Sequence, residues 1–416
     1  MSPRIAVIGL GHIGLPTALL CARNNEVVGV DVDESKVSAL EAGTVPLDEP
    51  GIRALYDEVC DAFSTRTDLV PADVYMIAVQ TPLDRQENVA DLQYVRAAVE
   101  SVAAMASAGE IVVLESTVPP GTSKRLVTPI LAEADENIGY AYCPERAIPE
   151  NTLHEMQHND RVVGANSAAT ADRVRYLYEE FSKGTVHTTD PTTAEFIKLV
   201  ENTSRDVNIA LANEFAKLSE DIGVDVHEAI DLANEHPRVK VLDPGPGVGG
   251  HCITTDPWFL TGTGHDPRLI PLARDINDGM PDHVLGFVRE LVGDPLHAQV
   301  AVLGVAYKGN VSDPRETPAG RFIRRAKNEG YDVTVHDPHV ERYEEPLLDR
   351  ATALNGADCA VVITDHDEFR ELSPRSFSEM RSHNVVDSRD VLDHDALREA
   401  GFDVAVLGDG SGADRE

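Results

Sequence analysis

A single cysteine follows a glycine-rich stretch in the middle of the chain. Cys252 comes directly after Pro-Gly-Pro-Gly-Val-Gly-Gly-His, and Asp256 lies four residues further on. Four glycines within six residues remove side chains, which lets the backbone approach a ligand closely. A free cysteine is usually a small buried hydrophobe, but a loop so rich in glycine offers little core to pack into. The stretch predicts a nucleophilic thiol, with a buried structural cysteine as the alternative.

Three polar residues before this loop share one side of a predicted long helix. Lys198, Asn202 and Arg205 are spaced i, i+4 and i+7, which places them on one face. An apolar set clusters on the other side, formed by Phe196, Leu199, Val200, Val207, Leu211 and Phe215. Periodicity alone leaves two interpretations of the polar stripe open, a solvated face and a face toward an active-site cleft.

The N-terminal segment carries a dinucleotide-binding pattern. A β-branched run ends at Gly9-Leu-Gly11-His-Ile-Gly14, a helical pattern follows, and the next strand, Glu26–Val30, ends at Asp31. This order is typical of a nucleotide-binding βαβ unit, in which Gly9 permits the turn, Gly11 admits the pyrophosphate and Gly14 allows close packing. Asp31 would bind the ribose hydroxyls and repel a 2′-phosphate, which favours NAD over NADP. The alternative is a tight βαβ turn without a ligand.

Polar residues follow three further predicted strands, at residues 74–79, 110–115 and 137–142. The ligand crevice of an open parallel sheet lies outside the carboxyl ends of its strands. These polar residues are therefore candidates for a site, with ordinary turn residues as the alternative. They are Thr81, Ser116, Thr117, Glu145 and Arg146.

The rest of the chain predicts one long helix and a second α/β region. Asp190-Pro191 is a typical helix start, and the pattern runs unbroken to Gly223, which gives a rod of about 46 Å and a natural dimer surface. From Gln299 the α/β rhythm returns, but the turn Gly304–Gly309 lacks the later glycines of the dinucleotide pattern and contains a lysine. That change favours a mononucleotide site. The tail Gly408–Glu416 is expected to be disordered.

These elements predict an α/β fold with two Rossmann-like, doubly wound parallel-sheet domains. A central α-helical domain that contains the long helix would join them. The predicted boundaries are 1–189 for the N-terminal domain, 190–297 for the central domain and 298–416 for the C-terminal domain.

The composition excludes several kinds of partner and site. The net charge of −35, from 71 acidic and 36 basic residues, repels nucleic acid and anionic membranes. We interpret it as the surface of a halophilic protein, because molar salt screens such repulsion; an ordinary acidic cytosolic protein is the alternative. Five scattered cysteines without a CxxC pair argue against a disulfide framework and a zinc site, so no metal is predicted. Without a membrane-length apolar run or a signal peptide, a cytoplasmic location is expected.

Six motifs resemble the UDP-glucose/GDP-mannose dehydrogenase family across nearly the whole chain. They are GLGHIGLPTA from Gly9, ESTVPPG from Glu115, YCPER from Tyr142, KLVENTSRDVN from Lys198, NEHPRV from Asn234 and PGPGVGGHCITTDPW from Pro244. The Gly-Gly-His-Cys form of the thiol loop is similar to the branch that acts on UDP-N-acetylhexosamines. The departures from the family pattern are Thr254-Thr255, Gln80 and Arg389.

The resemblance implies a four-electron, NAD-dependent oxidation at C6 of UDP-N-acetyl-D-mannosamine to the uronate. The Cys252 thiolate would trap the intermediate aldehyde as a thiohemiacetal, and oxidation would give a thioester that water hydrolyses. Two alternatives stay open. The substrate could be UDP-N-acetylglucosamine or UDP-glucose, or the chain could be a non-catalytic regulator that binds NAD or a UDP-sugar.

The resemblance also implies the roles of individual residues. Beside the nucleophile Cys252, Lys198 and Asn202 would stabilise developing oxyanions. The residues expected to help activate water are Asp256, Glu145 and Thr117. The NAD site would be lined by Gly9, Gly11, His12, Ile13, Gly14, Asp31, Thr81, Thr117 and Arg315. The UDP-sugar would be held by Arg146, Ala147, Lys198, Asn202, Arg205, His236, Arg238, Gly249, Tyr307 and Lys308. A homodimer through the central helical domain is expected.

Overall fold

The computed structural model describes residues 2–261 and 267–411, and the chain forms two compact units. The first unit contains the residues up to Glu201 together with the segment that begins at Trp258. The second contains Asn202–Pro257 and the residues from Pro267 onward. The change from one unit to the other at residues 201 and 202 falls inside one helix, α8 (Pro191–Ile222).

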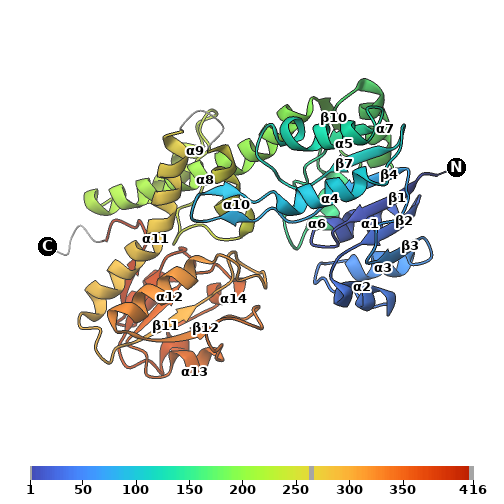
Figure 1. Cartoon of the computed structure of the whole chain (residues 1–416). Coiled ribbons are helices and arrows are strands. Elements are labelled where there is room, and N and C mark those ends of the chain that lie inside the picture. Colours follow the sequence, from blue (N-terminus) through green and yellow to red (C-terminus); the bar gives the residue numbers. More distant parts are fainter. Residues whose placement is uncertain (1, 262–266, 412–416) are drawn as a thin grey trace. The chain divides into compact units, whose positions relative to one another are not determined.

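The first unit is built on an eight-stranded sheet with the order β10-β9-β8-β7-β4-β1-β2-β3 (Figure 1). Neighbouring strands are parallel apart from the antiparallel pair β8 and β9. The strands are β1 (Arg4–Ile8), β2 (Glu26–Val30), β3 (Phe63–Arg66), β4 (Val74–Ile77), β7 (Ile111–Leu114), β8 (Gly139–Tyr142), β9 (Arg161–Ala165) and β10 (Val186–Thr189). A separate hairpin pairs β5 (Leu83–Asp84) with β6 (Val89–Ala90).

Apolar clusters cover both faces of this sheet, as the continuous apolar runs of its strands require. Successive residues of β1 point to opposite faces, so Ile5 and Val7 join one cluster and Ala6 joins the other. The helices of the unit before α8 are α1 (Gly14–Cys21), α2 (Glu34–Glu41), α3 (Ile52–Val59), α4 (Gln93–Ala103), the π-helix η1 (Ser123–Val127), α5 (Thr128–Ala134), α6 (Thr152–His158) and α7 (Ala168–Glu179).

The second unit contains a five-stranded parallel sheet with the order β12-β11-β13-β14-β15. Its strands are β11 (Gln299–Leu303), β12 (Asp332–His336), β13 (Cys359–Val362), β14 (Asn384–Asp387) and β15 (Asp403–Val406). This is the 2-1-3-4-5 order of doubly wound sheets, and the strand order reverses between β11 and β13. The predicted α/β class with two doubly wound sheets is confirmed.

Helices of the predicted central domain lie in the same compact unit as the C-terminal sheet. Val284, Leu285 and Val288 of α11 (Leu269–Val292) share one apolar cluster with Val300 and Val302 of β11. The three predicted domain boundaries stay predictions. The remaining helices of the unit are α9 (Val226–Asn234), α10 (His251–Thr255), α12 (Pro318–Glu329), α13 (Arg350–Leu354), α14 (Asp367–Arg370), the 3₁₀-helix η3 (Pro374–Phe377) and α15 (His394–Glu399). The 3₁₀-helix η2 (Asp256–Leu260) begins in this unit and ends in the segment of the first unit that starts at Trp258.

The long helix is confirmed, and it exposes apolar side chains. α8 spans 32 residues and ends before Gly223, whose φ of +71° stops the helix. Most of the predicted apolar set is exposed, whereas Lys198 of the polar stripe is buried. The exposed members are Phe196, Val200, Leu211 and Phe215.

The end of the described chain is ordered, which corrects part of the expected disorder. The N–H of Gly408 donates to Glu220 Oε1 at 2.9 Å. Its carbonyl accepts from Val226 N at 2.8 Å and from Ser219 Oγ at 3.1 Å. The prediction of a disordered tail is therefore wrong for residues 408–411, and residues 412–416 lie outside the described part.

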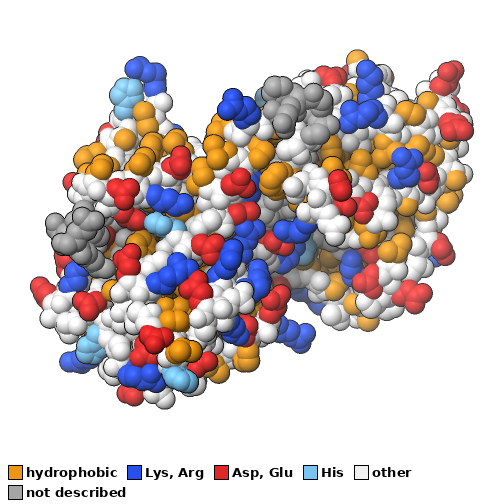
Figure 2. Space-filling model, turned by 60° about the vertical axis from the view of Figure 1, so that its left-hand side comes forward, with side chains coloured by type: hydrophobic (Ala, Val, Ile, Leu, Met, Phe, Trp, Pro, Cys, Tyr) orange, Lys and Arg blue, Asp and Glu red, His pale blue; other side chains and the backbone are white. Residues whose placement is uncertain are grey.

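The surface carries charges of both signs. Acidic and basic side chains are interspersed on the face shown in Figure 2, where apolar side chains are also exposed. None of the helices that the structure describes is long and apolar enough to span a lipid bilayer.

A carboxyl group is buried where β7 ends. Glu115 accepts hydrogen bonds from the Tyr178 hydroxyl at 2.7 Å and the Thr17 hydroxyl at 3.1 Å. Burial raises its pKa from 4.5 to about 7, against the opposing effects of the Tyr178 hydrogen bond and the Arg161 charge. The folded first unit therefore keeps a proton on Glu115 in a pH range in which the unfolded chain releases it.

We predict a pH-dependent gain in stability for Glu115→Gln. Between about pH 4.5 and 7 the folded state binds the Glu115 proton and the unfolded state does not, so this group lowers wild-type stability by about 1.4 kcal/mol per pH unit. A glutamine does not titrate, so the variant does not lose stability in this way. Urea unfolding from pH 5 to 8 should show the variant gaining on the wild type up to pH 7 and levelling off above it. A difference that does not change with pH would contradict the buried, titrating carboxyl.

Candidate active site

The turn after β1 is tightly packed at Gly9 and Gly14, whereas the space beside Gly11 is open. Gly9 has a φ of +92°, and a Cβ there would lie 2.6 Å from Ala78 O. A Cβ on Gly14 would overlap Gly9 O, whereas one on Gly11 would meet no atom within 4 Å. The first and third glycines are therefore needed for the turn itself, and the backbone at Gly11 faces open space, as the approach of a pyrophosphate requires.

Asp31 lies beside this turn at the end of β2. Its Oδ2 accepts from Leu10 N at 2.8 Å and pairs with Lys36 Nζ at 2.8 Å, and Oδ1 accepts from Asp33 N at 2.9 Å. Burial alone would raise its pKa, but the Lys36 hydrogen bond and the two backbone donors outweigh that effect and lower the pKa. The carboxylate is ionised and available as an acceptor.

The other residues predicted for the cofactor follow adjacent strands of the first sheet. Thr81 follows β4 and is buried, and Thr117 follows β7 and is half-buried. Since β1, β4 and β7 are neighbours, the structure brings both threonines to the sheet edge that carries the glycine turn. Within that turn His12 is exposed and Ile13 is half-buried. Arg315 belongs to the second unit.

Glu145 orders the loop after β8. Its Oε1 accepts from Arg146 N at 2.6 Å and Ala147 N at 2.8 Å, and Oε2 accepts from Arg161 Nη2 at 2.9 Å. Arg161 is buried, and its guanidinium lies 4.7 Å from the centre of the Tyr178 ring. Each carboxylate oxygen thus has a partner, and Glu145 holds the predicted substrate residues Arg146 and Ala147 in place. Arg161 was missed by sequence reasoning because it reads as part of an ordinary strand.

A second missed residue, the carboxylate Glu195, holds the segment after Thr117. Glu195 on α8 is fully buried and accepts from Gly121 N at 2.5 Å and Ser123 N at 2.6 Å. It lies one helical turn before Lys198, which is also buried in the first unit. One helix therefore presents Lys198 and fixes a loop that carries another candidate residue.

The space beside the glycines of the thiol loop is occupied by other residues of the second unit. A Cβ on Gly245 would lie 2.7 Å from Arg389 Nη1, and one on Gly247 would lie 2.8 Å from Asn277 O. A Cβ on Gly249 would lie 2.8 Å from Tyr307 Cβ. The space beside these glycines is therefore used for packing within the second unit, which differs from the expected approach of a ligand. The stretch is largely buried, so it does form part of a core.

A chain of buried amides anchors this loop to the helices. Gly245 N donates to Asn213 Oδ1 at 2.8 Å, and Asn213 Nδ2 donates to Asn277 Oδ1 at 2.9 Å. Asn277 Nδ2 donates to Asp206 Oδ1 at 2.8 Å, and Asp206 pairs with buried Arg274. No residue spacing in the sequence signals this network, since it joins α8, α11 and the loop.

Cys252 is exposed at the end of this anchored loop, as predicted for a nucleophile. The nearby guanidinium of Arg315 is fixed by its ion pair with Asp313, 2.6 Å between Nη2 and Oδ2, and Gly250 N donates to Arg315 O at 3.0 Å. The pKa of Arg315 is raised, first by its hydrogen bond with Asp313 and further by the charge that the Cys252 thiol acquires when it ionises. A neighbouring cation is the kind of group that stabilises a thiolate.

Two predicted catalytic residues meet in the same unit. Asn202 Nδ2 donates to Asp256 Oδ2 at 2.6 Å, and Asp256 is buried. Of the residues predicted to hold the sugar nucleotide, Gly249 packs so closely against Tyr307 that a Cβ on Gly249 would lie 2.8 Å from Tyr307 Cβ, and Lys308 is exposed. The other predicted substrate residues of this unit are exposed, namely Arg205, His236 and Arg238.

Comparison with protein families accounts for all three regions of the chain. The NAD binding domain of the UDP-glucose/GDP-mannose dehydrogenase family matches residues 3–182, its central domain matches 192–279 and its UDP binding domain matches 301–394. The chain belongs to the UDP-glucose/GDP-mannose dehydrogenase family. The resemblance seen in the motifs is thereby confirmed, and so is NAD as the cofactor.

Relatives within the UDP-glucose/GDP-mannose dehydrogenase family are similar over the full length. The UDP-N-acetyl-D-mannosamine dehydrogenase of Methanococcus maripaludis is 40% identical and is covered over 97% of its length by 98% of this chain. The NDP-N-acetyl-D-galactosaminuronic acid dehydrogenase of Ralstonia nicotianae is 38% identical, with coverages of 95% and 92%. The solved UDP-D-ManNAc dehydrogenase of Pyrococcus horikoshii superposes with a TM-score of 0.91 at 38% identity, over 98% of this chain and 99% of that one.

We predict that two glycine substitutions in the NAD turn affect different properties, one the stability of the protein and the other its affinity for NAD. Gly14→Ala should lower the melting temperature, because its methyl group would overlap Gly9 O. Gly11→Ala should melt like the wild type but bind NAD at least about tenfold more weakly, because the methyl group would occupy the open space that the phosphates need. Thermal melts and NAD titration calorimetry measure the two effects. A Gly14→Ala protein as stable as the wild type would refute this account of the turn.

Proposed function

We propose that this chain oxidises UDP-N-acetyl-D-mannosamine at C6 to the uronate, with NAD as the hydride acceptor. The observation that carries the proposal is the 40% identity, over 98% of the chain, to a UDP-N-acetyl-D-mannosamine dehydrogenase. Two further observations support it. The thiol loop has the Gly-Gly-His-Cys form, and other relatives are named for dehydrogenases of N-acetylated sugars.

The glycine turn of the first unit fits NAD. The open space at Gly11 suits a pyrophosphate, and the ionised carboxylate of Asp31 can accept from ribose hydroxyls. Thr81 and Thr117 lie on the same edge of the sheet. NAD bound there would supply the hydride acceptor for both oxidations, with one NAD⁺ consumed in each, which accounts for all four electrons.

Cys252 is the proposed nucleophile for the second half of the reaction. Its sulfur attacks the aldehyde carbon, the carbonyl electron pair moves to oxygen, and a thiohemiacetal forms. Oxidation of that adduct gives a thioester. Water then adds to the thioester carbonyl and expels the thiolate, which releases the carboxylate and restores Cys252. The exposure of the thiol and the nearby Arg315 guanidinium support this role.

Asp256 is the proposed acceptor of a proton from the hydrolytic water. Its hydrogen bond from Asn202 fixes the orientation of the carboxylate. Lys198 is proposed to stabilise developing negative charge on the substrate oxygen. Thr117 and Glu145 retain the roles that the family resemblance implies, although the saturated carboxylate of Glu145 favours a part in ordering its loop.

We predict that the purified enzyme, assayed in molar KCl, forms NADH and a uronate from UDP-N-acetyl-D-mannosamine. The high-salt buffer follows from the proposal that a net charge of −35 adapts the chain to a saline cytoplasm. UDP-N-acetylglucosamine and UDP-glucose are the comparison substrates. Turnover of UDP-glucose alone would overturn the proposed substrate, and no turnover of any sugar would favour the regulator.

Cys252→Ala is the decisive variant in that assay. It should bind NAD like the wild type and form no uronate, because no covalent adduct can form. Cys60→Ala, which removes another exposed thiol, is the matched control and should behave like the wild type. Normal uronate formation by Cys252→Ala would rule out the covalent mechanism.

We also propose that two copies of the chain associate through α8. Leu211, Phe215, Leu218 and Ile222 are spaced i, i+4, i+7 and i+11, so they form one stripe on the helix. All four are exposed, with 58% of Leu218 and 71% of Ile222 accessible. An apolar stripe of this kind on a surface helix is typical of a contact between proteins.

We predict that Leu218→Glu separates the two copies. Light scattering should give twice the chain mass of 45.1 kDa for the wild type and one chain mass for the variant. The matched control is Leu296→Glu, which changes an exposed leucine outside α8 and should leave the dimer intact. A variant at Leu218 that stays dimeric would show that this stripe is not the interface.

A further inference from the structure

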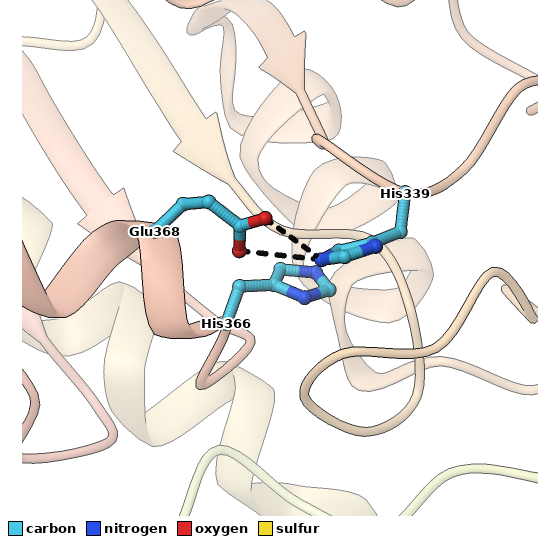
Figure 3. A group of neighbouring side chains, drawn as sticks. All are labelled: His339, His366 and Glu368. Carbon is cyan, nitrogen blue, oxygen red and sulfur yellow. Dashed lines mark hydrogen bonds and ion pairs between the residues drawn. The ribbon is translucent and has the colours of Figure 1, made fainter.

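Two histidines and a glutamate lie together at the switch point of the second sheet (Figure 3). His339 follows β12, while His366 and Glu368 follow β13, and their ligand atoms lie within 4.8 Å of one another. The set has the composition of a metal site. However, both ring nitrogens of His366 already have partners within the protein, so a different role has to be sought.

The hydrogen bonds of His366 fix its tautomer. Nδ1 accepts from Asn310 N at 2.9 Å, so it cannot carry a proton. Nε2 therefore carries the proton and donates to Asp337 Oδ2 at 3.1 Å. A metal ion would need one of these nitrogens with a free electron pair. His366, which is fully buried, acts instead as a bridge between Asp337 and Asn310.

These two partners hold opposite ends of the turn that carries Lys308. At the start of the turn, Asp337 Oδ2 accepts from Val305 N at 2.7 Å and Ala306 N at 3.0 Å. Burial would raise the pKa of Asp337, but the hydrogen bond from His366 and the backbone donors hold it well below its usual range. At the end of the turn, Asn310 donates to His366.

Asn310 needs such an anchor because of its backbone conformation. Its φ of +60° lies in the left-handed region, which is uncommon for a residue other than glycine. The N–H bond to His366 and the bond from Asp367 N to Asn310 Oδ1, at 2.9 Å, hold it there. The turn between β11 and this anchor lies where the strand order reverses, at the position where doubly wound sheets bind their ligands.

We infer that His366 is a positioning residue for the sugar nucleotide. Through Asn310 it sets the conformation of the turn that presents Lys308, without touching the ligand itself. The inference rests on the proposed role of Lys308 in holding the UDP moiety. It assigns the decisive bond to the Nδ1 side of the ring, since that side contacts the end of the turn two residues from Lys308.

Two substitutions separate the bonds of His366. In His366→Asn the side-chain oxygen can occupy the place of Nδ1 and accept from Asn310 N, but nothing reaches Asp337. In His366→Gln the amide nitrogen can occupy the place of Nε2 and donate to Asp337, but the Asn310 N–H loses its acceptor. Titration calorimetry with UDP should give a Kd raised about tenfold for His366→Gln and within about threefold of wild type for His366→Asn.

Further measurements separate a positioning role from a purely structural one. NAD, which binds the first unit, should bind both variants as it does the wild type, and His366→Gln should raise KM for the UDP-sugar far more than it lowers kcat. His339→Gln is the matched control, because His339 pairs with the exposed Glu368 and packs against the His366 ring, with 4.7 Å between ring centroids, but makes neither hydrogen bond of His366; it should bind UDP normally. Equal losses of UDP affinity or of folding in both His366 variants would overturn the inference.

Two further experiments test the role of Lys308 by itself and the alternative that the two histidines and the glutamate bind a metal. Lys308→Ala tests the proposed function by itself, and an unchanged Kd for UDP would remove the role of Lys308. If Lys308→Ala weakens UDP binding while His366→Gln does not, the inference alone fails. Dialysis against EDTA should leave the Kd unchanged, and a loss of UDP affinity would show that the group in Figure 3 binds a metal.

Discussion

The functional loops of this chain depend on buried side-chain acceptors for backbone N–H groups. A loop that approaches a ligand cannot satisfy its N–H groups within a helix or a sheet, and a buried unpaired donor is costly. Glu195 accepts two such groups in the segment after Thr117, and Glu145 accepts two in the segment after β8. Asn213 does the same for the thiol loop. The candidate catalytic and binding segments are therefore held in place by buried side chains, of which Glu195 and Asn213 have no proposed part in the reaction.

The turns after β1 and β11, one in each sheet, are held by the same pair of hydrogen bonds. In the first, Gly9 N donates to Val30 O at 2.7 Å and Leu10 N to the acid after β2 at 2.8 Å. In the second, Gly304 N donates to His336 O at 2.8 Å and Val305 N to the acid after β12 at 2.7 Å. The two turns then diverge. The first continues into a helix through two more glycines, whereas the second carries a lysine and is hydrogen-bonded to the segment that follows β13, which suits a smaller phosphate-bearing ligand.

Features that follow from local pattern could be predicted from the sequence, while long-range contacts could not. The glycine turn, the predicted strands and α8 are encoded by short-range spacing, and each is present where the pattern placed it, whereas β3, β9 and β10 were not predicted. The role of the glycines around Cys252 was different, because periodicity does not show that Tyr307 and Arg389 fill the space beside them. Asn213 was missed since its partner Asn277 lies 64 positions further along the chain, and Arg161 was missed since a lone arginine in a strand carries no pattern that marks it.

The hydrogen bonds that join Gly408 to α8 and α9 have a consequence for the order in which the protein folds during synthesis. Ser219, Glu220 and Val226 each complete a hydrogen bond with a residue roughly 180 to 190 positions further along the chain. During synthesis the junction of α8 and α9 leaves the ribosome long before this partner exists, so its polar groups must stay hydrated until Gly408 has emerged. Closure of the helical region is therefore delayed until the chain has been made through β15 and the residues that follow it.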